Sequence, residues 1–232
     1  MKIGDGFNLR LSVPGEGEVS DKAKLLSKIQ LYVIADKKIC GDRDVEDVVR
    51  QAMQGGVQMI QYRDKESDDA DFLSMARKLT AVCKERGVPF IVNDRVDIAA
   101  EADADGVHVG QKDLSVDQAR QILGSARIIG RSSSSLDQAI RAQDEGADYV
   151  GIGPIFDTPS KEIDKPIGLD VVPKANQMLG IPFFLIGGIT EENLSRVIEA
   201  GGRRIAVISA VVSSDHVTSA AASLLRRLRT GA

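Results

Sequence analysis

One structural unit recurs eight times along the sequence, and this repetition limits the folds that the chain can adopt. Each unit consists of a short apolar run rich in β-forming residues, a polar loop and an amphipathic stretch that ends near a glycine. Short apolar strands that alternate with helices require parallel pairing, with the helices covering the sheet. The predicted strands are residues 29–35, 57–62, 88–93, 106–109, 127–130, 149–152, 182–186 and 204–208. Predicted helices between and after these strands include residues 45–53, 68–86, 116–123, 136–145, 169–178, 191–200 and 217–228.

Eight such units in about 200 residues favour a closed (β/α)8 barrel, a TIM barrel of the α/β class, over an open sheet. No GxGxxG motif opens the first unit, which argues further against an open dinucleotide-binding sheet. We therefore expect a single barrel domain over residues 29–232. A short N-terminal extension, residues 1–28, would precede it, partly mobile and helical near residues 21–28.

Two predicted helices begin with the spacing of a capping box. Ser115 stands three residues before Gln118, and Ser135 stands three residues before Gln138. In such a box the serine oxygen accepts from the third helical N–H, and the glutamine side chain accepts from the serine N–H. These two positions mark where a loop ends and a helix begins.

The composition argues against several classes of function. A formal net charge of -4 gives no general basic field for nucleic acid or for a membrane surface. Cys40 and Cys83 are the only cysteines and form no CxxC pair, which argues against a disulfide scaffold or a structural zinc site. No apolar run is long enough to span a bilayer, and the first residues lack the apolar core of a secretory signal. We therefore expect a cytoplasmic protein.

The segment QYRDK, residues 61–65, closes the second apolar run. Residues two apart share one face of a strand, so Gln61, Arg63 and Lys65 are expected on the same side. Two cations there indicate a bound phosphate or diphosphate, because arginine offers a planar fork of donors and lysine a mobile point charge. Solvated charges at a frayed strand end are the alternative, and the segment alone does not decide between them.

Two acids follow neighbouring predicted strands. Asp94 comes directly after the third strand, and Asp113 comes four residues after the fourth. Because the ends of neighbouring parallel strands lie close together, the two carboxylates can converge on one Mg²⁺ ion. The alternative is a helix cap for Asp94 and an ordinary turn for Asp113. Their place beside Arg63 and Lys65 favours the metal.

Later loops carry further candidates for anion binding. Ser132 is the serine nearest the end of the fifth strand. The connection 153–168 is long enough to be a lid or binding loop, and it carries Thr158, Ser160 and Lys161.

The loops after the last two strands are expected to form a second, neutral anion site. Gly188 follows the seventh strand, and Ile208 and Ser209 end the eighth. In barrels of this kind these loops often bind phosphate through backbone N–H groups, which glycine allows to come close.

Seven motifs, in their order and spacing, resemble those of thiamine phosphate synthase: QYRDK, IVNDR, ADGVHVGQKDL, GRSS, DYVGIGPIFDTPSK, IGGIT and AVISA. The resemblance runs from about residue 29 to about residue 211. It implies a transferase that joins 4-amino-2-methyl-5-hydroxymethylpyrimidine diphosphate to 4-methyl-5-(2-phosphoethyl)thiazole and releases diphosphate. The implied mechanism is dissociative, assisted by Mg²⁺, and passes through a pyrimidine carbocation without a protein nucleophile.

The resemblance also assigns roles to residues at matching positions. The pyrimidine diphosphate would be bound by Gln61, Arg63, Lys65, Asn93, Ser132 and Lys161, of which Arg63, Lys65 and Lys161 would be catalytic by stabilising the leaving group. The thiazole phosphate would be bound by Thr158, Ser160, Gly188, Ile208 and Ser209. Asp94 and Asp113 would hold Mg²⁺. The implied partners are these two small molecules, without nucleic acid or membrane, and the resemblance permits a homodimer or a monomer.

The sequence departs from the family at Ser134, where relatives often have histidine. That absence argues against a related function, thiazole tautomerase, whose proposed acid/base chemistry would need the imidazole. His108, on the fourth predicted strand, is a candidate to replace it, although a single histidine on a strand is more often structural. A third alternative is a barrel that binds thiamine precursors without catalysis, as a sensor or carrier.

Overall fold

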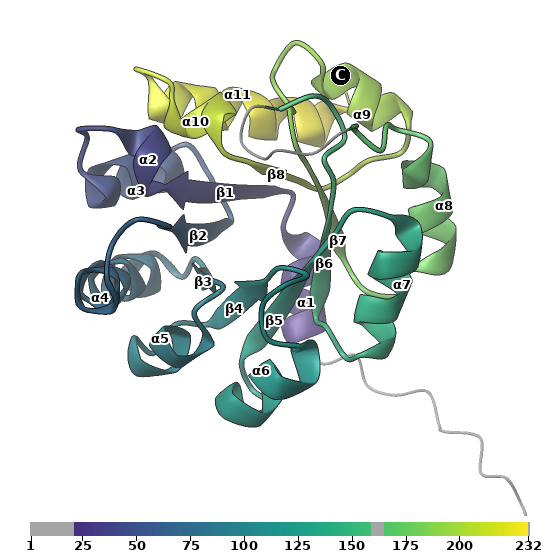
Figure 1. Cartoon of the computed structure of the whole chain (residues 1–232). Coiled ribbons are helices and arrows are strands. Elements are labelled where there is room, and N and C mark those ends of the chain that lie inside the picture. Colours follow the sequence, from purple (N-terminus) through teal and green to yellow (C-terminus); the bar gives the residue numbers. More distant parts are fainter. Residues whose placement is uncertain (1–20, 159–164, 232) are drawn as a thin grey trace, which may run out of the picture.

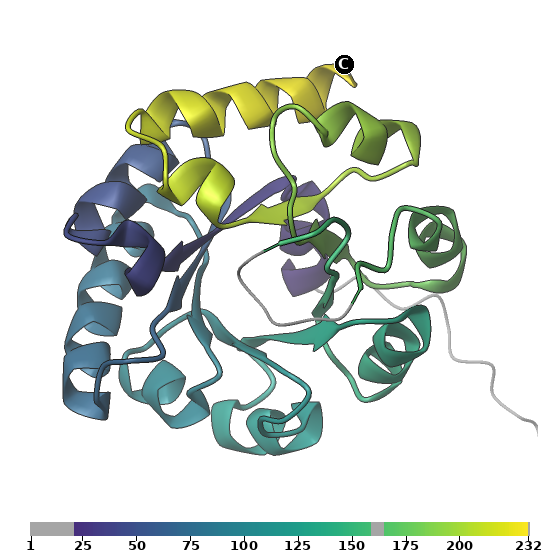
Figure 2. The same cartoon turned by 45° about the horizontal axis from the view of Figure 1, so that its top comes forward.

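The computed structural model describes residues 21–158 and 165–231, which form a closed barrel of eight parallel strands. Each strand pairs with the next one in the chain, and β8 pairs with β1 to close the ring (Figure 1). The predicted TIM barrel is confirmed. Figure 2 shows the helices arranged around the central strands.

The element bounds follow the predicted units closely. The strands are β1 Leu31–Asp36, β2 Met59–Arg63, β3 Phe90–Asn93, β4 Gly106–Val109, β5 Ile128–Ser133, β6 Tyr149–Ile152, β7 Phe183–Ile186 and β8 Ile205–Val207. The helices are α1 Asp21–Lys28, α2 Lys37–Cys40, α3 Val45–Gln54, α4 Asp69–Arg86, α5 Val96–Glu101, α6 Val116–Leu123, α7 Leu136–Asp144, α8 Val171–Met178, α9 Leu194–Glu199, α10 Ser209–Val212 and α11 Val217–Thr230.

Side chains alternate between two apolar layers along each strand. On β1, Tyr32 and Ile34 point into the barrel, where they join an interior cluster that includes Phe184 of β7. Leu31 and Val33 point outward into a larger layer between the strands and the helices. Strands buried on both faces explain why the sequence shows continuous apolar runs rather than alternation.

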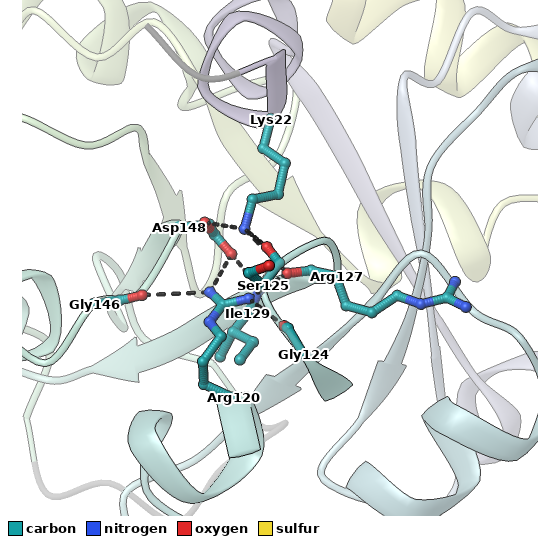
Figure 3. A network of polar contacts seen from close by, with 8 residues as sticks. All are labelled: Lys22, Arg120, Gly124, Ser125, Arg127, Ile129, Gly146 and Asp148. Carbon is teal, nitrogen blue, oxygen red and sulfur yellow. Dashed lines mark hydrogen bonds and ion pairs between the residues drawn. The ribbon is translucent and has the colours of Figure 1, made fainter. Parts of the chain in front are cut away.

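Helix α1 covers the end of the barrel at which the strands begin. Leu26 of α1 is fully buried and belongs to the interior cluster. Lys22 Nζ lies 2.8 Å from Asp148 Oδ1 and donates to the carbonyl of Ser125 over 2.8 Å (Figure 3). The helix expected at residues 21–28 is therefore present and packs against the barrel. The predicted mobility of the earlier residues lies outside the described part of the chain.

Some details of the strands and helices differ from the sequence predictions. Strand β5 continues to Ser133, because Ser132 and Ser133 still pair with β6 in register. The short helices α2 and α10, each four residues long, occupy loops that the pattern left unassigned. The capping box at Ser115 is confirmed.

At the start of α7 the predicted capping box is only half formed. Ser135 Oγ accepts from Gln138 N, as expected. The Gln138 side chain instead accepts from the backbone and the hydroxyl of Ser134, at 2.8 and 3.0 Å.

None of the helices in the described ranges combines the length and the apolar character that a membrane span requires.

Candidate active site

A cavity of about 270 Å³ opens at the carboxyl ends of the strands. This is the end of the barrel where function was expected. Seven of the predicted site residues line it: Gln61, Arg63, Ser132, Thr158, Gly188, Ile208 and Ser209. Much of the remaining wall is apolar and includes Ile34, Phe184 and Ile186.

Arg63 reaches the cavity from the last position of β2, held by a carboxylate of the neighbouring strand. Its Nη1 donates to Oδ2 of Asp36, the last residue of β1. Asp36 is 3% exposed, and its Oδ1 also accepts from Ile39 N at the start of α2. The guanidinium group has three nitrogens that carry N–H donors, and this contact uses one of them. It therefore orients Arg63 and leaves donors for a ligand.

Lys65 lies beyond the end of β2, in a loop rather than on the strand as expected. Its ammonium group forms an ion pair with Oδ2 of Asp94 from the next βα loop. Both cations of the QYRDK segment are thus met by carboxylates within the structure. The predicted solvated alternative is wrong for Arg63, whose side chain is only 26% exposed.

Asp94 and Asp113 converge from neighbouring loops, as predicted. Burial, followed by the neighbouring Asp94 carboxylate, raises the pKa of the Asp113 carboxyl above its usual range. Asp113 Oδ2 also accepts from Gly110 N over 2.7 Å, so the turn expected as an alternative is present too. The N-cap residue of α5 is Arg95 rather than Asp94, and it makes no side-chain cap hydrogen bond.

The backbone at Asp94 adopts a conformation that non-glycine residues rarely use, with φ of 60°. Arg95 fastens this loop to the preceding one, because its Nη1 lies 2.9 Å from Asp69 Oδ1 and its Nη2 donates to Ser67 O over 2.7 Å. The guanidinium also lies 4.4 Å above the ring of Phe72. Strained backbone held by such contacts is typical of functional sites.

Asp64 organises the loop that carries Lys65. Its Oδ1 accepts from the backbone of Glu66 at 2.9 Å and Ser67 at 3.1 Å, and Oδ2 accepts from Tyr62 OH at 3.0 Å. Burial on its own would raise the pKa of Asp64, but hydrogen bonds from Ser67, Glu66 and Tyr62 outweigh it and lower that pKa to about 2. Asp64 is therefore ionised and locks the turn.

Among the described residues, no group of three or more histidine, cysteine, aspartate or glutamate side chains forms a metal cluster. A pair of carboxylates is nevertheless the donor set that Mg²⁺ favours, since this ion keeps several waters and takes further oxygens from substrate phosphates. Asp94 and Asp113 fit that requirement.

The loop after β7 requires its two glycines. Gly187 and Gly188 have φ of 100° and 63°. A Cβ on Gly188 would lie 2.3 Å from the carbonyl oxygen of Asp157, in the loop that follows β6. Asn193 holds the turn together, because its Oδ1 accepts from Thr190 N at 2.9 Å and its Nδ2 donates to Gly188 O at 2.8 Å. The loop therefore brings backbone close to the cavity.

A chain of hydrogen bonds crosses the barrel beneath the cavity. Gln61 Nε2 donates to Tyr32 OH, which lies 3.0 Å from Tyr149 OH. Tyr149 OH lies 3.0 Å from His108 Nδ1, and His108 Nε2 lies 2.9 Å from Ser132 Oγ. Burial raises the pKa of both tyrosine hydroxyls, so these groups remain protonated. His108 is thus a hydrogen-bonded residue on the cavity wall.

The remaining predicted residues lie as follows. Asn93 ends β3 opposite His108 in the register, on the face that Ile91 presents to the barrel interior. Ser160 and Lys161 lie outside the described residues. Ser134 lines the cavity, but its hydroxyl is bound to Gln138.

Sequence reasoning missed Asp36, Tyr32 and Tyr149 as site residues. Asp36 carried a detectable signal, because an acid directly after the first predicted strand neighbours Arg63, which directly follows the second. The tyrosines gave no such signal, since a tyrosine in an apolar run is indistinguishable from core.

Comparisons with known proteins agree with this geometry. The family model described as "Thiamine monophosphate synthase" matches residues 31–211. A thiamine-phosphate synthase of Shouchella clausii is 42% identical over 86% of this chain and 96% of its own length. A solved structure, thiamine phosphate pyrophosphorylase from Pyrococcus furiosus, superposes with a TM-score of 0.81 at 35% identity, covering 89% of this chain and 98% of that one.

A thiamine-phosphate synthase of Thermosynechococcus vestitus is 44% identical over 90% of this chain. The chain spans only 59% of the length of that relative. From the family model and these similarities together, the chain belongs to the thiamine monophosphate synthase family.

Proposed function

We propose that this chain is a thiamine phosphate synthase, which joins the pyrimidine diphosphate to the thiazole phosphate and releases diphosphate. The observation that carries the proposal is the presence of two different candidate anion sites at the mouth of one barrel. One is charged and contains Arg63, Lys65, Asp94 and Asp113. The other is built from backbone that follows β7 and β8. Two phosphorylated substrates with different charge call for such a pair.

In the charged site, Arg63 and Lys65 would bind the diphosphate and stabilise it as it leaves. Their carboxylate partners, Asp36 and Asp94, hold the cations in place before the substrate arrives. Such preorganisation lowers the barrier because the protein does not reorient during the reaction. Lys161 would add a third cation from the long loop, by the family resemblance.

Asp94 and Asp113 would hold Mg²⁺ at the same site. When bound, this ion would supply positive charge for the departing diphosphate.

The apolar part of the cavity suits the carbon skeletons of the two substrates. Loss of diphosphate leaves a cation at the carbon attached to the pyrimidine ring, and the thiazole nitrogen then forms the new C–N bond. Ile34, Phe184 and Ile186 on the wall would exclude water, which would otherwise capture this cation. The protein's task is thus to bind, align and shield, with no nucleophile of its own.

The test is turnover by the purified chain with both substrates, with and without Mg²⁺, followed by oxidation of the product to fluorescent thiochrome. We expect thiamine phosphate to form only when Mg²⁺ and both substrates are present. Binding of both ligands without product would reject the synthase and favour the sensor or carrier. Conversion of the thiazole ligand alone would favour the tautomerase.

A further inference from the structure

The orientation of the Gln61 amide, with Nε2 toward Tyr32, gives the chain of hydrogen bonds from Gln61 to Ser132 a direction. Gln61 Nε2 can only donate, so the oxygen of Tyr32 is an acceptor in that contact. The proton of Tyr32 then needs its own acceptor. Among the described residues, Gln61 and Tyr149 lie within hydrogen-bonding distance of this hydroxyl, and of the two only the Tyr149 oxygen can accept its proton. Tyr32 is 2% exposed, so its hydroxyl needs an acceptor within the protein.

The direction of the hydrogen bond from Tyr32 determines which atom donates in each later bond, as far as the cavity. Tyr149 accepts from Tyr32 and therefore donates its own proton to His108 Nδ1, 3.0 Å away. A neutral imidazole with Nδ1 as acceptor carries its proton on Nε2. Nε2 then donates to Ser132 Oγ over 2.9 Å. The serine proton is left to point toward the cavity that Ser132 lines.

The backbone beside His108 leaves space for these hydrogen bonds. A Cβ on Gly130 would lie 2.5 Å from His108 Nδ1 and 2.2 Å from Tyr149 Cζ, so any other residue there would separate the two groups. Tyr149 is also fixed on its other side, by edge-on packing against Phe184 with ring centroids 5.5 Å apart. The contact between tyrosine and histidine thus depends on a glycine of the strand between them.

We propose that Tyr32, Tyr149 and His108 are positioning residues that hold the Ser132 hydroxyl as a hydrogen-bond donor to an acceptor atom of the pyrimidine substrate. A ring nitrogen of that substrate is such an acceptor, whereas its exocyclic amino group is a donor. This series of hydrogen bonds therefore selects a ligand that presents a lone pair to the Ser132 hydroxyl. The identity of the ligand in this inference rests on the proposed function. The direction of the hydrogen bonds is argued from the protein's own contacts, without the ligand.

The direction is tested by ¹⁵N NMR of the ligand-free chain with labelled histidine. The sequence contains only two histidines, and the exposed His216 serves as an internal reference. We expect a protonated Nε2 and a hydrogen-bonded, unprotonated Nδ1 for His108, and we expect Tyr149→Phe to remove the hydrogen-bond shift at Nδ1. The matched control is Tyr62→Phe, which also deletes a buried tyrosine hydroxyl but lies outside the chain. A proton on Nδ1 in the unsubstituted chain would overturn the proposal.

The link to the ligand is tested by a double-mutant cycle on calorimetric binding of the pyrimidine diphosphate. We expect Ser132→Ala and Tyr149→Phe each to weaken binding about tenfold, the loss typical of one well-placed hydrogen bond. Because Tyr149 acts through Ser132, the double variant should bind about as well as Ser132→Ala alone. Thermal unfolding of each variant confirms that it remains folded.

The outcomes separate the two proposals. Absence of binding by the unsubstituted chain would reject the proposed function, and the inference about the ligand with it. Normal binding with fully additive losses in the cycle would reject the positioning role alone, because Tyr149 would then act independently of Ser132. Binding of the thiazole phosphate should change little in Tyr149→Phe, and an equal loss for both ligands would indicate general structural damage instead.

Discussion

Replacing Asp148 tests whether α1 is bound to the barrel as the structure indicates. Asp148 precedes β6 at the end of the barrel opposite the cavity, and its carboxylate joins three elements (Figure 3). Oδ1 lies 2.8 Å from Lys22 Nζ of α1. Oδ2 lies 2.7 Å from Arg120 Nη2 of α6 and accepts from Ile129 N of β5 over 2.8 Å. Asp148→Ala removes all three contacts.

The expected loss follows from the exposure of the partners. The side chains of Lys22 and Arg120 are 23% and 25% exposed, so each ion pair contributes only about 0.5–1 kcal/mol. The Ile129 N–H group is buried and would lose its acceptor, which costs about 1–3 kcal/mol. We therefore expect Asp148→Ala to lower the free energy of unfolding by about 2–5 kcal/mol.

The assay is equilibrium unfolding in urea, with Asp148→Asn as the matched control. The asparagine oxygen can still accept from Ile129 N–H, so this variant should lose only the ion pairs, about 1–2 kcal/mol. Turnover should be unchanged in both variants, because the site lies at the other end of the strands. Equal losses in the two variants would refute the reasoning about the buried N–H group. A loss below about 1 kcal/mol for alanine would show that α1 is not held as described.

Further predictions concern the site and its loops. Arg63→Ala and Asp94→Asn should each reduce turnover at least about a hundredfold while the unfolding transition persists, because each removes a charge that stabilises the leaving diphosphate; near-normal turnover in either would reject its role. Gly188→Ala should raise KM for the thiazole phosphate and lower Tm, because φ is 63° and the new Cβ would lie 2.3 Å from a carbonyl oxygen. Gly180→Ala, whose Cβ would come no closer than 3.7 Å to its neighbours, is the control and should change neither. The pKa of Asp64 falls from 3.8 to about 2 on folding, so its contribution of about 2 kcal/mol is complete above pH 4 and is lost as pH falls toward 2. The free energy of unfolding of Asp64→Asn should lack this loss between about pH 4 and pH 2. If the variant shows the same pH profile as the unsubstituted chain, the role of Asp64 is contradicted.

The barrel was predictable because its signal is local and repeated. Each strand is an apolar run, and each helix start or glycine at a helix end is marked by residues a few positions apart. Strand ends were less certain. The predicted fifth strand ended before Ser132 and Ser133 because these residues are polar. In the structure they pair with β6 and belong to β5. Tertiary pairing overrides local propensity there.

The positions of several candidate site residues in the barrel were predictable, but their contacts were not. Strand order placed Arg63, Lys65 and Asp94 at one end of the barrel, as observed. Their pairing with carboxylates depends on neighbouring loops, because Asp36 stands 27 positions before Arg63 and Asp94 stands 29 after Lys65. The contact between Tyr32 and Tyr149 joins residues 117 positions apart, and only closure of the barrel brings them together. The oligomeric state and the cytoplasmic location stay predictions.

The most direct test of the two-site account is a crystal structure of the chain with Mg²⁺, diphosphate and the thiazole phosphate bound together. The account predicts diphosphate at Arg63 and Lys65, and Mg²⁺ held by Asp94 and Asp113. It places the thiazole phosphate group against the backbone at Gly188 in the same crystal. Competition of both anions for one position, or diphosphate bound away from Arg63, would contradict the account.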